Sequence, residues 1–176
     1  MSVIPFSQAL RERTRSSHGD SAGATFMSDL MTGQGSRDDY IALVAQHYYI
    51  YEALEAAALR FADDAVASPF ISPQLTRLPA LELDLDYLVG PDWRDAHPPV
   101  PATTRYVDRI TEVADEGWAG GFVAHHYTRY LGDLSGGQHI GRVVKRVYGL
   151  DADRGAAFFA FDQIDDAKAF KDTYRA

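Results

Sequence analysis

The chain is organised around residues 125–138, which read HHYTRYLGDLSGGQ. Apolar residues at helical spacing lie on both sides of this stretch, so it is predicted to lie within a helix. Glycine inside a helix costs about 1 kcal/mol relative to alanine, yet Gly132, Gly136 and Gly137 occur together here, with Gly141 close behind. Gly132 and Gly136 are four residues apart, so they share a helix face and leave a notch without side chains. Either another backbone or a flat ligand could approach the main chain at this notch.

Composition limits the classes of protein to which the chain can belong. Its 176 residues are enough for one domain with a substantial core. The net charge of −8 argues against nucleic-acid binding. The absence of cysteine excludes zinc–thiolate sites, iron–sulfur clusters and thiol nucleophiles, so metal chemistry must use histidines or carboxylates. The N-terminus does not resemble a signal peptide, and no stretch approaches the ~18 consecutive apolar residues of a membrane span. We therefore expect a soluble cytoplasmic protein.

The rest of the chain reads as a series of helices separated by proline- and glycine-rich turns. A first helix is predicted to begin after Ser7, whose hydroxyl can cap it, and to run to about His18. Further helices are predicted over residues 26–31, 36–64, 75–88, 104–114, 122–148 and 165–175, with residues 92–101 as a loop. Runs of alternating β-branched residues and Asn-Gly or Asp-Gly hairpins do not occur. The sequence predicts an all-α protein in which about eight helices form a single domain over residues 1–176.

Residues 127–138 resemble the signature of the haem oxygenases. The resemblance covers almost the whole chain, because residues 10–18, 51–55, 81–85, 156–159 and 170–175 also match the family in character. A long matching string with a histidine at the corresponding upstream position is much more specific than a lone pair of glycines. The resemblance implies a helix bundle that holds haem between a proximal helix and a distal helix kinked at the glycines.

The resemblance assigns the two faces of the haem site. His18 on the proximal helix corresponds to the iron ligand, and Gly132, Gly136 and Gly137 correspond to the distal surface. With an imidazole on one side of the haem and bare backbone on the other, one coordination position of the iron stays open for water or O₂. A β-carbon on the distal side would collide with O₂ or with the macrocycle.

The resemblance also implies which residues direct the reaction. Asp133 is the only carboxylate in the glycine cluster, and the matching Asp of the family acts through ordered water to steer the attack to the porphyrin edge. Tyr51 matches the partner of that water network, and Arg129 lines the substrate face or bonds within the network. With Gly132 and Gly136, these three residues form the predicted catalytic set.

Haem carries two propionates, which need cations in an otherwise acidic protein. By resemblance these contacts come from Arg11, Tyr127, Lys171 and Arg175. Without the resemblance, Lys171 and Arg175 would be read as a solvated helix face, since they lie four residues apart near the chain end.

Three positions depart from the family pattern. Arg11 stands where many members have lysine, which keeps the charge but changes its geometry. Ala22 replaces an acidic residue that orients the proximal imidazole, a function for which Asp20 is the available substitute. The sequence ends at Ala176, where many members continue with another helix and some with a membrane anchor, so we expect no anchor.

The other histidines have more ordinary explanations. His125 and His139 each lie seven residues from Gly132, which is two helical turns or about 10 Å along the axis. Packing or hydrogen bonding explains both better than ligation. No constellation of residues singles out His47, His97 or His126.

The resemblance therefore predicts a monooxygenase that cleaves haem, with O₂ and electrons, to biliverdin, CO and ferrous iron. Haem would be both substrate and cofactor. The glycine string lacks the preceding strand of a nucleotide-binding fingerprint, so a separate NAD(P)H-dependent reductase, directly or through a ferredoxin, is expected to supply electrons for iron acquisition or bilin synthesis. Two rivals are a haem-binding protein for storage or transfer, disfavoured by Asp133, and a related helical protein acting on a small heterocycle, disfavoured by His18.

Overall fold

The computed structural model describes Glu12, residues 25–151 and residues 154–175, and within these ranges the chain is helical and contains no strand. The α-helices are α2 (Thr25–Thr32), α3 (Arg37–Arg60), α4 (Leu78–Leu88), α5 (Trp93–Ala96), α6 (Pro101–Asp115), α7 (Ala119–His126), α8 (Gln138–Tyr148) and α9 (Ala167–Arg175). Shorter turns are the 3-10 segments η1 (Ser68–Phe70), η2 (Pro73–Leu75) and η5 (Ala157–Phe159) and the π-helical segments η3 (Tyr127–Leu131) and η4 (Asp133–Gly137). The all-α prediction is confirmed. Apart from Glu12, the predicted first helix, with Arg11 and His18, lies outside the described residues.

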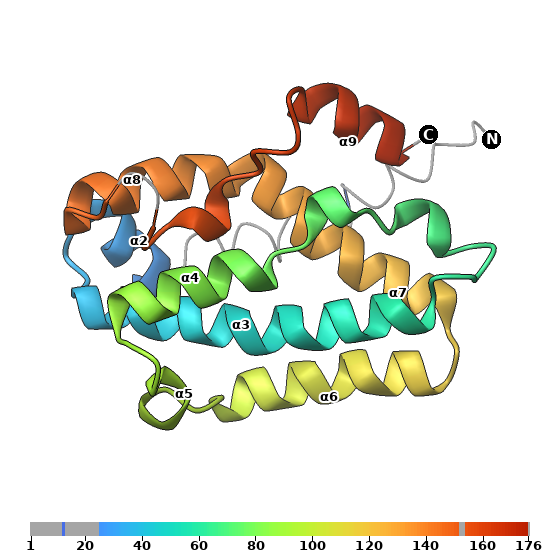
Figure 1. Cartoon of the computed structure of the whole chain (residues 1–176), viewed down its shortest axis with the longest axis horizontal. Helices are drawn as coiled ribbons and strands as arrows, with labels where there is room; N and C mark the ends of the chain where they lie inside the picture. The colour runs from blue at the N-terminus through green and yellow to red at the C-terminus, as the bar shows by residue number, and fades with distance from the viewer. Residues whose placement is uncertain (1–11, 13–24, 152–153, 176) are drawn as a thin grey trace.

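Helix α3 is the central element of the bundle (Figure 1). It begins with a capping box, in which the Ser36 hydroxyl accepts a hydrogen bond from the Asp39 amide at 3.0 Å and the Asp39 carboxylate accepts one from the Ser36 amide at 2.8 Å. Tyr40, Val44 and Tyr51 are fully buried along it. Helices α4 and α6 pack along α3, so α3 holds Tyr51 rigidly inside the molecule.

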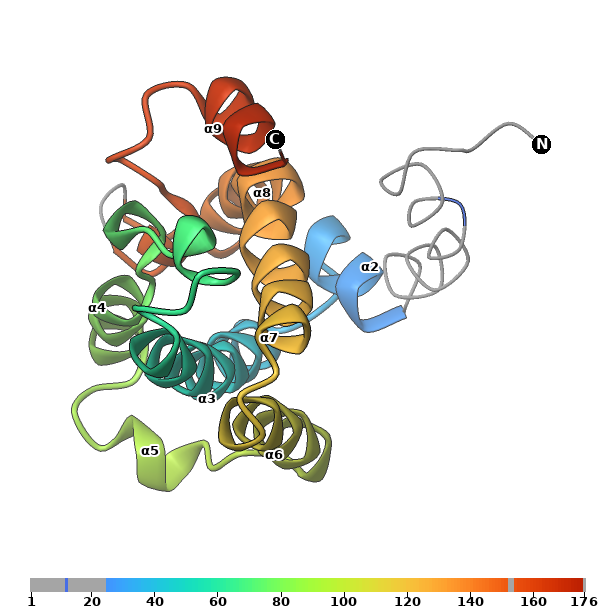
Figure 2. The ribbon, with the colours of Figure 1, turned by 90° about the vertical axis from the view of Figure 1, so that its right-hand side faces the viewer.

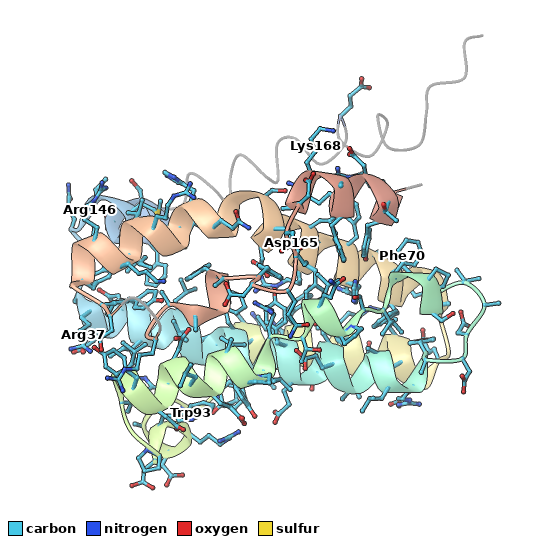
Figure 3. The ribbon with its side chains drawn as sticks, turned by 45° about the horizontal axis from the view of Figure 1, so that its top comes forward. Arg37, Phe70, Trp93, Arg146, Asp165 and Lys168 are labelled. Atoms are coloured by element: carbon cyan, nitrogen blue, oxygen red, sulfur yellow. The ribbon has the colours of Figure 1, made fainter. Side chains whose placement is uncertain are left out.

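Part of the predicted loop over residues 92–101 is helical, so that prediction was wrong at both of its ends. Trp93, labelled in Figure 3, begins the short helix α5 and is only 1 % exposed. Its ring lies 4.8 Å from that of Tyr48. Helix α6 begins at Pro101 rather than at Thr104. Proline suits the first helical position because it has no amide hydrogen to lose there.

Two buried charged residues, Arg77 and Asp84, hold the segment around η5 against α4. Arg77 donates a hydrogen bond to the Phe158 carbonyl at 3.2 Å and lies 4.0 Å over the ring of Phe161. The Asp84 carboxylate accepts hydrogen bonds from the amides of Ala157 and Phe158, both at 2.8 Å. These contacts fix the aromatic side chains of η5 against the helices that build the site.

Helices α7 and α8 follow one another past α3, and α9 lies across the point where they join (Figure 2). Gly149, with φ +61°, ends α8 in the left-handed conformation, as the Tyr148-Gly149 pair predicts. The Phe70 ring packs 5.0 Å from that of Tyr174 in α9 (Figure 3 labels Phe70). Helix α9 is thus anchored beside the glycine-rich segment.

Candidate active site

The glycine-rich stretch is a helix with two widened turns. The π-helical segments η3 and η4 meet at Gly132, whose backbone angles of φ −60° and ψ −50° remain helical. π-Turns are rare and are frequent at functional sites. The family resemblance implies a kink at the glycines, and the structure has two π-helical segments there.

The glycines face in two different directions. Apart from its neighbours in the chain and the backbone of its own helix, a β-carbon added to Gly132 or Gly136 would have no described atom within 4 Å. A β-carbon on Gly141 would lie 2.6 Å from Phe159 Cβ, and one on Gly137 would lie 3.4 Å from Phe159 Cδ1. The sequence left close packing and a ligand surface as alternatives, and each applies to one pair of glycines. Gly137, predicted to contact haem, is placed on the packed side.

This division predicts opposite effects of two alanine substitutions. Gly141→Ala is expected to destabilise the haem-free protein by about 1–3 kcal/mol, since the new methyl group overpacks against Phe159. Gly136→Ala is expected to leave the stability unchanged or raise it by up to about 1 kcal/mol, because alanine favours the helix, but to weaken haem binding. Denaturant unfolding and haemin titration of both variants measure these effects. Equal losses of stability would contradict the assignment of the two faces.

Asp133 and Tyr51 are brought together from distant parts of the chain. The Tyr51 hydroxyl donates a hydrogen bond to the Asp133 Oδ2 across a separation of 82 residues in sequence. Tyr51 is fully buried on α3, whereas Asp133 retains some exposure on η4. The contact fixes the carboxylate next to the open glycine face.

The surroundings of this pair affect both protonation equilibria. Burial raises the pKa of Asp133 above its ordinary value of 3.8, against the opposing effect of the Arg129 charge and the Tyr51 hydrogen bond. Burial, followed by the negative charge of Asp133, raises the pKa of Tyr51 well above 10. Tyr51 therefore remains a protonated donor at neutral pH, and Asp133 ionises less readily than an exposed aspartate.

Arg129 completes this group from η3. Its guanidinium carbon lies 5.3 Å from the centre of the Tyr51 ring, and its charge favours ionisation of Asp133. The structure therefore brings three of the predicted catalytic residues, Asp133, Tyr51 and Arg129, into one cluster.

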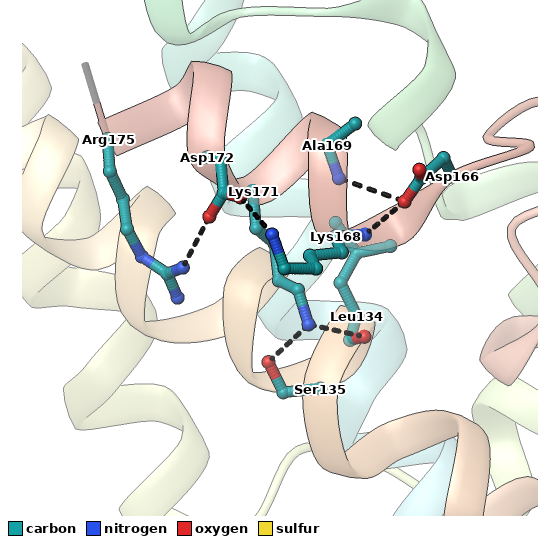
Figure 4. Close-up of polar contacts among 8 residues, drawn as sticks. All are labelled: Leu134, Ser135, Asp166, Lys168, Ala169, Lys171, Asp172 and Arg175. Atoms are coloured by element: carbon teal, nitrogen blue, oxygen red, sulfur yellow. Dashed lines mark hydrogen bonds and ion pairs between the residues drawn. The ribbon is translucent and has the colours of Figure 1, made fainter.

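Of the predicted propionate-binding residues within the described ranges, Lys171 lies against the glycine-rich segment. The Lys171 ammonium lies 3.2 Å from the Ser135 hydroxyl and 3.4 Å from the Leu134 carbonyl, which joins α9 to η4 (Figure 4). Arg175 lies beside Asp172, with 4.0 Å between the charged atoms. The Tyr127 ring packs 6.1 Å from that of Tyr174.

Sequence reasoning missed two aromatic neighbours of Tyr51. The Tyr130 ring lies 5.2 Å from that of Tyr51, and the His47 ring lies 6.5 Å from it. His47 precedes Tyr51 by four residues and therefore lies on the same face of α3, which is a signal the sequence does contain. Of the remaining histidines, His125 contacts the Tyr106 hydroxyl at 3.3 Å, in line with the packing interpretation.

Among the described residues no group of three or more His, Cys, Asp or Glu side chains could hold a metal ion. The described part of the site combines the polar cluster of Asp133, Tyr51 and Arg129 with the open backbone surface of Gly132 and Gly136. It can accommodate a flat molecule, hold a proton donor near it and present cations at one edge.

Comparison with known proteins agrees with this geometry. The family model described as "Heme oxygenase" matches residues 4–176. The chain is 41% identical over 175 residues to heme oxygenase 1 of Synechocystis, covering 99% of this chain and 72% of that protein. It is 41% identical over 172 residues to human heme oxygenase 1, covering 97% of this chain and 59% of that protein.

Solved structures give the same result. The crystal structure of heme oxygenase-1 from Synechocystis in complex with heme matches with a TM-score of 0.88 and 39% identity, over 98% of this chain and 77% of that one. The heme oxygenase of Leptospira interrogans matches with a TM-score of 0.89 and 33% identity, over 98% and 83%. The sequence and the fold agree with this family over nearly the whole length of the chain. The chain belongs to the haem oxygenase family.

Proposed function

We propose that this chain cleaves haem, with O₂ and electrons, to biliverdin, CO and ferrous iron, and that Asp133 is the residue that directs the cleavage. The observation that carries the proposal is the position of the Asp133 carboxylate. It is held by Tyr51 directly beside the surface of Gly132 and Gly136, which no described side chain covers. Membership of the haem oxygenase family favours cleavage over storage or transfer of haem.

The residues present fit haem as the occupant of this surface. Gly132 and Gly136 offer bare backbone to the face of a macrocycle, and Lys171 offers a cation at the edge. When bound, haem supplies both the iron that activates O₂ and the porphyrin carbon that is attacked.

The chain's own residues would position a proton beside the macrocycle. Tyr51 stays protonated and donates to Asp133, which leaves the second carboxylate oxygen free to orient a water molecule. The buried surroundings that raise the pKa of Asp133 also strengthen its hydrogen bonds, since little bulk water competes there. Arg129 balances the negative charge of the cluster.

Lys171 would bind a haem propionate with its ammonium group. Lys171→Gln is expected to weaken haem binding about tenfold, because a charge-assisted hydrogen bond contributes roughly 1.5 kcal/mol or more. Lys168→Gln is the matched control, since it removes the same charge from the same helix but from a side chain paired with Asp172 at 2.8 Å (Figure 4). Haemin titrations measure both, and equal weakening by the two substitutions would remove Lys171 from the propionate site.

The remaining assignments rest on the resemblance. His18 would ligate the iron, with Arg11, Tyr127 and Arg175 as further propionate contacts. The resemblance assigns Gly137 to the distal surface, and Gly137 packs towards Phe159. A separate NAD(P)H-dependent reductase, directly or through a ferredoxin, would supply the electrons. No described helix is both long enough and apolar enough to cross a membrane, and we place the reaction in the cytoplasm.

The direct test is a single-turnover assay. Haemin is added to the purified protein until the Soret band saturates, and a reductant and O₂ are then supplied. Loss of the Soret band with formation of biliverdin and CO is expected. A stable oxygenated or ferric spectrum without bilin would overturn the proposed activity.

A further inference from the structure

Two buried polar atoms near Tyr51 are Nδ1 of His47 and Nε of Arg129. Neither has a hydrogen-bond partner among the described residues. Buried polar atoms are almost always hydrogen-bonded in native proteins, to protein or to ordered water. Two unpaired atoms around the same side chain therefore need a common explanation.

His47 and Arg129 both lie beside Tyr51 and belong to different elements. The His47 ring on α3 meets the Tyr51 ring edge to face, with 81° between the planes and 6.5 Å between centroids. Phe158 of η5 holds the imidazole at a centroid distance of 5.0 Å. The Arg129 guanidinium, on η3, lies 5.3 Å from the centre of the Tyr51 ring. Both unpaired groups thus border the side chain that holds Asp133.

The two atoms are complementary in chemistry. The Nε–H of arginine can only donate a hydrogen bond, whereas Nδ1 of a neutral imidazole protonated at Nε2 can only accept one. Burial, and next the charge of Arg129, lower the pKa of His47 well below 6.5, so the imidazole is neutral at physiological pH. A water molecule needs at least two polar partners in a buried site, and these two atoms provide a donor and an acceptor.

We infer that His47 is a positioning residue of the active site, whose Nδ1 accepts a hydrogen bond from one ordered water that in turn accepts the Nε–H of Arg129. This link fixes Arg129 beside Tyr51 and thereby the electrostatic surroundings of the Asp133 carboxylate. The effect of this link on catalysis rests on the proposed haem cleavage. The link itself is expected to be present in the haem-free protein as well. The competing reading is a histidine that only packs against Tyr51 and Phe158.

Nuclear magnetic resonance of the haem-free protein tests the link without reference to activity. The ¹⁵N shifts of His47 are expected to report a neutral ring between pH 6 and 8 with the proton on Nε2 and Nδ1 as acceptor. The Nε–H resonance of Arg129 is expected to be protected from exchange with solvent in the wild type and in His47→Gln, whose amide can bond the same water. His47→Leu, which fits an apolar site but cannot bond, is expected to lose this protection. A proton on Nδ1, or full protection in His47→Leu, would overturn the inference.

Activity measurements test the consequence. His47→Leu is expected to bind haem as the wild type does but to form biliverdin about tenfold more slowly, the lower end of the effect of such supporting residues, and His47→Gln is expected to restore the rate. The matched control is His139→Leu, the same change at an exposed position of α8. If the wild-type protein formed no biliverdin, the proposed function would be refuted, but the result from nuclear magnetic resonance would remain valid. Normal turnover in His47→Leu would refute the positioning role.

Discussion

Asp133→Ala is expected to bind haem with nearly wild-type affinity and to form biliverdin at least about 100-fold more slowly, the usual loss when a positioned proton-transfer group is removed. Haem contacts the backbone of Gly132 and Gly136 in the proposed complex, so the carboxylate contributes little to affinity. Its removal leaves no group to orient the proton-donating water and leaves the Tyr51 hydroxyl without its acceptor. Haemin titration and single-turnover absorbance measure the two quantities separately.

The control for this substitution is Asp86→Ala, which removes an exposed carboxylate from α4 and should change neither quantity. Biliverdin formation by Asp133→Ala at the wild-type rate would exclude Asp133 from the mechanism. Loss of haem binding would instead assign Asp133 to the binding surface.

The same carboxylate is expected to lower the stability of the folded protein. Because its pKa is raised by folding, the ionised form is disfavoured in the folded state. The resulting loss of folding free energy is absent below the pKa of Asp133 in the unfolded chain, about 4, and is fully present above its pKa in the folded protein. Asp133→Asn should therefore melt at a higher temperature than wild type at pH 7, by about 2–4 °C per kcal/mol in a chain of this size. The difference should close as the pH is lowered, and a lower melting temperature at pH 7 would contradict this view of the site.

His18→Ala is expected to lose the axial-ligand spectrum of the ferric complex and to abolish ring opening. A neutral imidazole is the only iron ligand that the resemblance assigns, and a methyl group cannot replace it. Added imidazole should restore the ligand spectrum, because the shortened side chain leaves room for it. His139→Ala, at an exposed position, is the control. An unchanged spectrum in His18→Ala would move the ligand to another residue.

Much of the fold was readable from the sequence because it is encoded locally. The capping box of Ser36 and Asp39 marks the start of α3, and Gly149 marks the end of α8 at the predicted residue. The short helix α5 was missed because Trp93 is ordered by packing on Tyr48, a contact 45 positions away that local pattern cannot report. Elements with their own periodicity and caps are predictable, and those stabilised by tertiary contacts are not.

The candidate site divides in the same way. The family resemblance singled out Tyr51 and Arg129, and Asp133 also stood out as the only carboxylate among the glycines. Their mutual contacts were not predictable, since these depend on how α3 packs against η3 and η4. His47 lies four residues before Tyr51. The sequence did not single it out, because the role we infer for it depends on Arg129, which belongs to another element.

By itself, the sequence determined an all-α chain with a glycine-rich helical segment, a lone carboxylate within it and the family to which both point. Only the tertiary structure decided that Gly136 faces open space while Gly141 faces Phe159, and that the Tyr51 hydroxyl meets Asp133. The reason is geometric: helical periodicity fixes which residues share a face, whereas the partner that each face meets is set by packing between elements far apart in the chain.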